Sequence, residues 1–112
     1  MSSLSDKAKI VRDALNNVPG LKSYHFHKPA DVNAPYAVWQ EDSEDNSFHA
    51  NNRKAEQVLQ LTIDYFTLTE YDDTADKIQE ALNNAEVAWK LNSFQYEDDT
   101  KLSHYEWLVK VI

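Results

Sequence analysis

The segment Gln57–Phe66 (QVLQLTIDYF) constrains the fold of this chain more than any other segment. Apolar side chains occupy alternate positions in it, namely Leu59, Leu61, Ile63 and Tyr65. The positions between them are polar: Gln60, Thr62 and Asp64. Period-two alternation among β-forming residues predicts a strand that packs one face on a core. Because about ten residues is long for a strand, we expect it to be a central member of its sheet.

Two segments have the spacing of amphipathic helices. In the first, apolar residues recur every three or four positions from Leu4 to Val18, with Ser5 as the expected N-cap and Pro19-Gly20 at the end. The second helix follows the long strand, and Asp72-Asp73 provides its N-cap. Its apolar stripe consists of Ala75, Ile78, Leu82 and Ala85, and Asn83-Asn84 suits its end.

Four further segments predict strands. Lys22–Lys28 alternates aromatic and histidine side chains, and Tyr36–Asp42 follows after the turn Ala30–Pro35, so we expect the two to form a hairpin with a loose connection. The others are Glu86–Leu91, which continues to Tyr96, and Leu102–Ile112. Each tryptophan, Trp39, Trp89 and Trp107, falls on one of these strands and is expected in the core.

The apolar alternation changes phase at Asn92-Ser93. Trp89 and Leu91 are odd-numbered, whereas Phe94 and Tyr96 are even-numbered. One extra residue in a strand shifts the alternation in this way. The sequence therefore predicts a bend or bulge at this point.

These elements define an α+β fold, with a mainly antiparallel sheet of about five strands and two helices packed on one face, in the order α-β-β-β-α-β-β. At 112 residues, the chain is expected to be one domain covering residues 1–112. The second face of the sheet is too polar for another core, so we expect it to meet solvent or a partner. Its residues are Gln60, Thr62, Asp64, His104, Glu106 and Lys110.

Composition excludes several functions. The chain has no cysteine, which removes disulfides, thiolate metal sites and a cysteine nucleophile. It shows no apolar run of about 20 residues and no signal-peptide pattern, so we expect cytosolic synthesis and no membrane. Its only glycine, Gly20, cannot build a phosphate-binding loop, a dinucleotide fingerprint or a nucleophile elbow. The net charge of −8 disfavours ordinary nucleic-acid binding; it suits solubility, or a wall along which DNA passes without sticking.

Candidate chemical sites have simpler explanations. His25 and His27 could point at one metal ion, but two outward-facing side chains on a strand are the more economical interpretation. Asp72-Asp73 and Asp98-Asp99 could act as acid and base, although aspartate is expected at caps and turns for backbone reasons. The acidic run from Glu41 to Asp45 lacks the glycine of an EF-hand loop. We therefore expect no metal, no cofactor and no enzymatic activity.

The segment Ser43–Lys54 shows neither helical nor strand periodicity. It is about as long as structureless loops become in compact domains, and such loops are often functional. Its single aromatic residue, Phe48, either packs under its own loop or anchors a neighbouring subunit. Both alternatives are open at this stage.

Four segments of the chain resemble the tail terminators, the small tail-completion proteins of long-tailed bacteriophages that infect Gram-positive hosts. The first two are Val18–Phe26, a turn that leads into an aromatic strand, and Pro35–Asp42 (PYAVWQED). The third is Phe48–Arg53 (FHANNR) with the following LTIDYFT, which is similar to an ELYT-like segment of the family. The fourth is the tyrosine-rich end, residues 96–112. Ala50-Asn51-Asn52 departs from the more usual Ala-Asp-Asn.

The resemblance implies a structural function in the virion tail, at the head–tail interface, of a phage or prophage. Tail terminators form a ring, typically a hexamer, that ends polymerisation of the tail tube and provides the surface for head attachment. The implied partners are other copies of the chain, the tail tube protein and the head connector or stopper protein, with DNA only passing through the lumen. The implied contact residues for the neighbouring subunit or the tube are Phe48, His49, Asn51, Asn52 and Arg53.

Two alternatives are left open by the sequence. A head-closure or connector protein of the same interface would also be a small acidic ring protein. A monomeric adaptor, from a different functional class, would bind one partner through the edge of its sheet.

Overall fold

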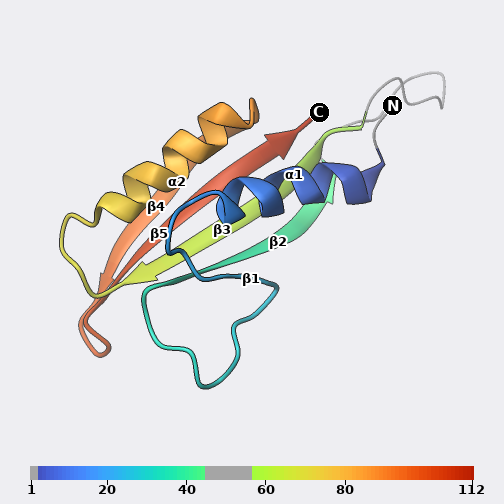
Figure 1. Ribbon diagram of the computed structural model, residues 1–112. Coiled ribbons are helices and arrows are strands. Elements are labelled where there is room, and N and C mark those ends of the chain that lie inside the picture. The colour runs from blue at the N-terminus through green and yellow to red at the C-terminus, as the bar shows by residue number, and fades with distance from the viewer. Residues whose placement is uncertain (1–2, 45–56) are drawn as a thin grey trace.

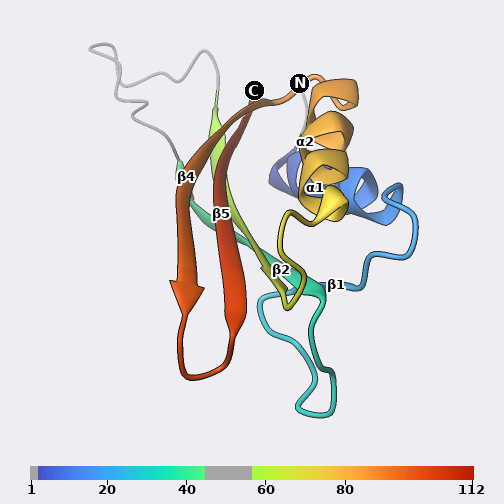
Figure 2. The same ribbon diagram turned by 90° about the vertical axis from the view of Figure 1, so that its left-hand side faces the viewer.

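The computed structural model describes residues 3–44 and 57–112. Within them the chain forms an α+β fold, in which both helices lie on one face of a five-stranded mixed sheet (Figures 1 and 2). The elements in chain order are α1 (Leu4–Asn16), β1 (Ser23–His25), β2 (Tyr36–Glu44), β3 (Leu59–Thr67), α2 (Asp73–Asn84), β4 (Ala88–Glu97) and β5 (Leu102–Val111).

Strand β3 is the centre of the sheet, as the length of its segment predicts. The strands lie side by side in the order β1-β2-β3-β5-β4, so β3 pairs with β2 on one side and β5 on the other, antiparallel to both. Strand β5 lies between β3 and β4 because the β4–β5 hairpin folds back toward the centre (Figure 1). Spatial order therefore differs from chain order at this edge.

The predicted hairpin between the first two strands is wrong. Strands β1 and β2 pair in parallel, with Ser23 opposite Ala37 and His25 opposite Trp39, so the sheet is mixed rather than mainly antiparallel. The intervening residues 26–35 return the chain to the start of β1, where the Ala37 N–H donates to the Lys22 carbonyl over 2.8 Å. A hairpin needs only a short turn, whereas a parallel pair requires such a long return.

Strand β1 is also shorter than the predicted Lys22–Lys28. It ends at His25 because Phe26 has a φ of 72°, which is in the left-handed region and interrupts the extended backbone. Phe26 is consequently 56% exposed, although the alternation suggested a strand position for it.

The core lies between the sheet and the two helices. Its largest fully buried side chains come from β3, β5 and both helices, and the buried apolar residues of β3 are the four that the alternation predicts. Trp107 is fully buried and Trp39 is 5% exposed, which confirms the expectation for these two, whereas Trp89 is only partly buried. Burying several aromatic and branched side chains at about 2 kcal/mol each supplies the main stabilisation.

The cap of α1 differs from the prediction. Ser3, rather than Ser5, is the N-cap, and its Oγ accepts a hydrogen bond from the Asp6 N–H over 3.0 Å. The Asp6 carboxylate in turn accepts from the Ser3 N–H over 3.3 Å. This reciprocal pair requires a serine and an acidic residue three positions later. Ser3 has Asp6 at that position, whereas Ser5 has no acidic residue there.

The cap of α2 is confirmed and is part of a larger network. The Asp72 carboxylate accepts hydrogen bonds from the Thr74 N–H (2.9 Å), the Tyr65 hydroxyl (2.7 Å) and the Thr67 hydroxyl (2.6 Å). Burial alone would raise the pKa of Asp72, but these donors together outweigh it and lower the pKa. Asp72 thus fixes α2 to the end of β3.

Candidate functional site: the open face of the sheet

The face of the sheet opposite the helices has no covering element among the described residues (Figure 2). It is formed by the even-numbered residues of β3 and the residues paired with them on β2 and β5. The predicted polar residues of the second face all lie here: Gln60, Thr62, Asp64, His104, Glu106 and Lys110. Because alternate residues of a strand point to opposite faces, the burial of Leu61 and Ile63 places Thr62 and Asp64 on this surface.

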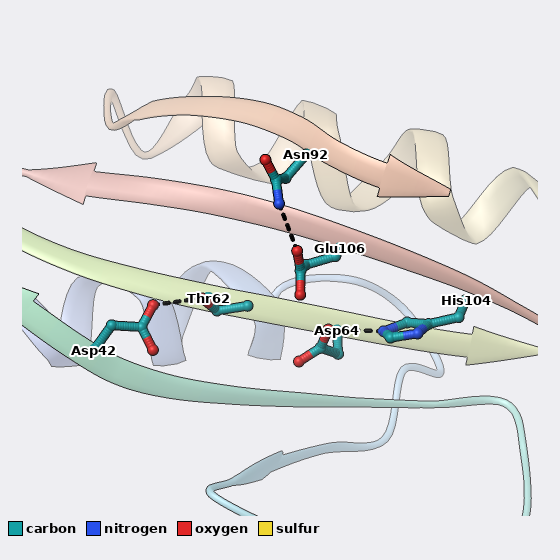
Figure 3. Close-up of polar contacts among 6 residues, drawn as sticks. All are labelled: Asp42, Thr62, Asp64, Asn92, His104 and Glu106. Atoms are coloured by element: carbon teal, nitrogen blue, oxygen red, sulfur yellow. Dashed lines mark hydrogen bonds and ion pairs between the residues drawn. The ribbon is translucent and has the colours of Figure 1, made fainter. Parts of the chain in front are cut away.

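Three hydrogen-bonded pairs cross the middle of this face (Figure 3). The Thr62 hydroxyl of β3 donates to the Asp42 carboxylate of β2. His104 Nε2 of β5 lies 2.7 Å from the Asp64 carboxylate of β3. Asn92 Nδ2 of β4 donates to the Glu106 carboxylate of β5 over 2.6 Å. Side chains from four adjacent strands are therefore joined pairwise into a polar ladder.

Both ends of the polar ladder lie at irregularities in the sheet. The register of β2 with β3 shifts between Glu41 and Ser43, and the register of β4 with β5 shifts between Leu91 and Ser93. The intervening residues are Asp42 and Asn92. A bulge adds one residue to a strand and redirects its side chain, and bulges are common beside functional sites. The predicted bulge at Asn92-Ser93 is confirmed; the one at Asp42 was not predicted.

Asp64 is the most strongly perturbed carboxylate of the open face. Its side chain is 24% exposed, and it stands directly opposite Glu106 in the register of β3 and β5. Burial raises the pKa of Asp64, the hydrogen bond from His104 opposes this rise, and the nearby charges of Glu106 and Asp42 add to it. The net effect is a pKa above the usual range, mainly because burial disfavours the ionised carboxylate, with a smaller contribution from the like charge opposite it.

A row of stacked rings adjoins the polar ladder. Tyr36 stacks on Phe66 with 5.0 Å between ring centroids, and Phe66 stacks on His104 with 4.2 Å. The Lys28 ammonium lies 5.5 Å from the centre of the Tyr36 ring. Burial, with a smaller contribution from the charge of Glu97, raises the pKa of Tyr36.

The open face offers polar groups and aromatic rings that can bind a partner by hydrogen bonding and stacking. Its carboxylates Asp42, Asp64 and Glu106 each have a hydrogen-bond partner on a neighbouring strand, and His104 is flanked by a carboxylate and an aromatic ring. Among residues 3–44 and 57–112, no group of three or more His, Asp or Glu side chains is arranged to hold a metal ion. No helix in that part of the chain is long and apolar enough to cross a bilayer.

The predicted contact residues lie outside the described residues: Phe48, His49, Asn51, Asn52 and Arg53. Their role stays a prediction. Of the two candidate metal histidines, His25 is not on the open face, because it stacks on Trp39 with 4.0 Å between centroids and pairs with Glu41 over 2.5 Å. His27 follows β1 and is exposed. Asp72 caps α2, and residues 98–101 form the turn of the β4–β5 hairpin.

Sequence reasoning missed three members of this face. Tyr36 and Phe66 extend it with rings, and Asn92 reaches it from the bulge of β4. Phe66 follows the alternation of β3, since it is even-numbered like Thr62 and Asp64. That parity was the available signal. Tyr36 follows from pairing with Phe66, which the sequence alone does not reveal.

A comparison with known proteins provides no further identification. No protein-family model matches the chain, and no curated protein is significantly similar to it.

Proposed function

We propose that this chain is a structural subunit that forms a ring at the head-proximal end of a phage tail tube, where it ends tube polymerisation and provides the surface for head attachment. The proposal combines the resemblance to tail terminators with the surfaces that no element of the described residues covers. In this function, the partners are further copies of the chain, the tube protein and a head connector protein.

The observation that carries the proposal is the uncovered edge strand β4. This strand is ten residues long and pairs only with β5 among the described strands. The strand itself extends past the end of α2 (Figure 2). Its apolar side chains on the helix-covered face are largely exposed: Leu91 by 44%, Phe94 by 55% and Tyr96 by 56%. Monomeric proteins usually protect long edge strands, so an unprotected one with apolar side chains favours assembly with other chains.

The acidic groups of the open face agree with this function. Asp42, Asp64 and Glu106 lie across adjacent strands of one surface. Carboxylates repel phosphate, so a surface of this kind beside a DNA path would not retain the DNA.

The test is to locate the chain in phage particles and to remove it. Antibody labelling of purified particles should mark the head-proximal end of the tail. Loss of the chain should give tails of irregular, extended length that do not join heads. Labelling of tail-less, DNA-filled heads instead would support the head-closure alternative. Absence from all particles, together with one captured host protein, would support the adaptor.

The predicted contact residues are tested in the same system. Phe48→Ala combined with Arg53→Ala should reproduce the defect in tail length and head joining, whereas His27→Ala, an exposed residue outside that segment, should not. Normal tails from the double variant would show that Ser43–Lys54 is not the contact segment.

A further inference from the structure

The free edge of strand β4 has a side-chain pattern that is complementary to itself. On the helix-covered face the strand carries three exposed apolar side chains, Leu91, Phe94 and Tyr96. On the open face it carries a basic residue, Lys90, toward one end and an acidic residue, Glu97, at the other. Reversing the direction of such a strand exchanges the two charges and leaves an apolar centre at Phe94.

The bulge of β4 makes this pattern symmetric about Phe94. The register with β5 shifts at Asn92, so this residue adds no step to the alternation of the strand. Leu91 and Tyr96 are therefore both two steps from Phe94, on opposite sides of it and on the same face. The two charged residues are both three steps away, on the open face. Symmetric positions thus match in chemistry.

We propose that two copies of the chain pair their β4 strands antiparallel, about a two-fold axis that passes beside Phe94. In this register Phe94 lies opposite its counterpart, Leu91 opposite Tyr96, and Lys90 opposite Glu97, and the last two pairs each occur twice. Directly opposed residues of antiparallel strands have Cβ atoms about 5 Å apart, close enough for apolar contacts and ion pairs. The two sheets become one continuous sheet.

The placement of α2 leaves space for the second copy (Figure 2). The helix begins at the level of Phe94, because its N-cap Asp72 accepts from the Tyr65 hydroxyl, and Tyr65 and Phe94 pair with the same residue of β5. It ends near the start of β4, where the Trp89 indole N–H donates to Asn83 over 2.8 Å. Since the partner runs in the opposite direction, its α2 lies beside the part of β4 that the first α2 leaves uncovered.

The charges favour a second copy over an unrelated strand. Lys90 and Glu97 would face uncharged or like-charged groups on most strands, whereas a copy provides the opposite charge at both positions. Because a two-fold contact uses the same surface on both partners, it occupies both β4 edges and ends at a dimer. The inference goes beyond the proposed ring, since it describes the chain before it meets a tail.

Sedimentation of the full chain, combined with charge reversal, tests the contact. At micromolar concentrations the chain should sediment as a dimer that dissociates on dilution. Lys90→Glu and Glu97→Lys should each raise the dissociation constant roughly ten-fold, since each places like charges opposite one another twice. The double variant exchanges the charges and should restore dimerisation. Lys9→Glu, at an exposed position of α1, is the matched control and should have no effect.

Cysteine cross-linking tests the register, because the natural chain contains no cysteine. A mixture of Lys90→Cys and Glu97→Cys, treated with a short bis-maleimide, should give a cross-linked heterodimer in which the other charge pair is intact. Neither variant alone should cross-link, since identical residues of the two copies are about six steps, or roughly 20 Å, apart in this register. Circular dichroism verifies that each variant is folded.

Three outcomes overturn the inference: a monomer at every concentration, a dissociation constant that ignores the charge reversals, or cross-linking of either cysteine variant with itself. Protection of the β4 amides from hydrogen exchange only after tube protein is added would assign the edge to that protein instead. A dimer formed as described by a chain that is absent from tails would contradict the proposed function and leave this contact intact. A chain found at the tail end that is monomeric in solution would contradict the contact alone.

Discussion

The two faces of β3 show how one strand meets two different physical requirements. On the helix-covered face, Leu61, Ile63 and Tyr65 are fully buried. On the open face, Thr62 and Asp64 are partly exposed and pair with polar residues of β2 and β5. The first set is selected for burial and shape, the second for hydrogen bonding and charge. Stability therefore depends mainly on one face, and the other is available for interaction.

The two faces also differ in how they affect the carboxylate of an aspartate. Asp72, on the helix side, accepts hydrogen bonds from three donors and has a lowered pKa. Asp64, on the open face, has His104 as its partner but stands opposite Glu106, and its pKa is raised. Burial by itself favours a higher pKa for both, but at Asp72 the hydrogen bonds outweigh it. The local donors and charges therefore decide whether the ionised carboxylate stabilises the fold.

The largest expected difference between the faces is in unfolding free energy. Trp107→Ala should lower it by about 3–5 kcal/mol, because the side chain is fully buried and its indole N–H donates to Gln79 Oε1 over 3.0 Å. Thr62→Ala, on the other face, should change it by about 0.5 kcal/mol. Urea unfolding at neutral pH measures both. Equal losses for the two variants would show that the open face contributes to stability as much as the core does.

The next largest effect is expected at Asp72. Asp72→Asn should cost about 1–3 kcal/mol, because an amide cannot accept from the Tyr65 and Thr67 hydroxyls as a carboxylate does. The stabilisation by Asp72 is present above the pKa of about 3.9 in the unfolded chain and is lost as pH falls through the lower folded value. Urea unfolding from pH 7 to 2 should therefore show the two proteins converging at low pH. Asp73→Asn is the matched control, since Asp73 is exposed; a similar loss there would contradict the role of the network.

Much of this comparison is visible in the sequence. The alternation of Gln57–Phe66 predicts both faces of β3, and the length of the segment predicts its central position. The change of phase at Asn92-Ser93 predicts the bulge, and Asp72-Asp73 predicts the cap of α2. These features are local: each depends on residues within about ten positions of one another, so the pattern of side chains suffices to specify them.

The features that the sequence does not reveal depend on distant contacts. The parallel pairing of β1 depends on where residues 26–35 return, and the φ of Phe26 that ends this strand has no signature in the alternation. The pairing of Asp64 with Glu106 requires the register of β3 with β5, and the row of rings requires that of β3 with β2. A shift of one residue would move every one of these side chains to the other face. Register is set by the complete sheet. The sequence therefore predicts that the open face is polar, but not which side chains on it contact one another.

The smallest expected effect also has the opposite sign, and it is at Asp64. Asp64→Asn should raise the unfolding free energy at pH 7 by under about 1 kcal/mol, because it removes a charge that burial disfavours and that Glu106 and Asp42 repel. A folded pKa above the unfolded value means that ionised Asp64 destabilises the fold at neutral pH. As pH falls through the folded pKa toward about 3.9, the natural protein regains this stability and the advantage of the variant disappears. Urea unfolding at several pH values measures the difference, and NMR titration of the carboxyl measures the pKa itself.

Glu106→Gln is the matched control: it should lower the pKa of Asp64 while leaving the hydrogen bond from His104 in place. A measured pKa at or below the ordinary range, with a destabilised Asp64→Asn variant, would mean that the two aspartates behave alike and that the faces do not differ in this respect.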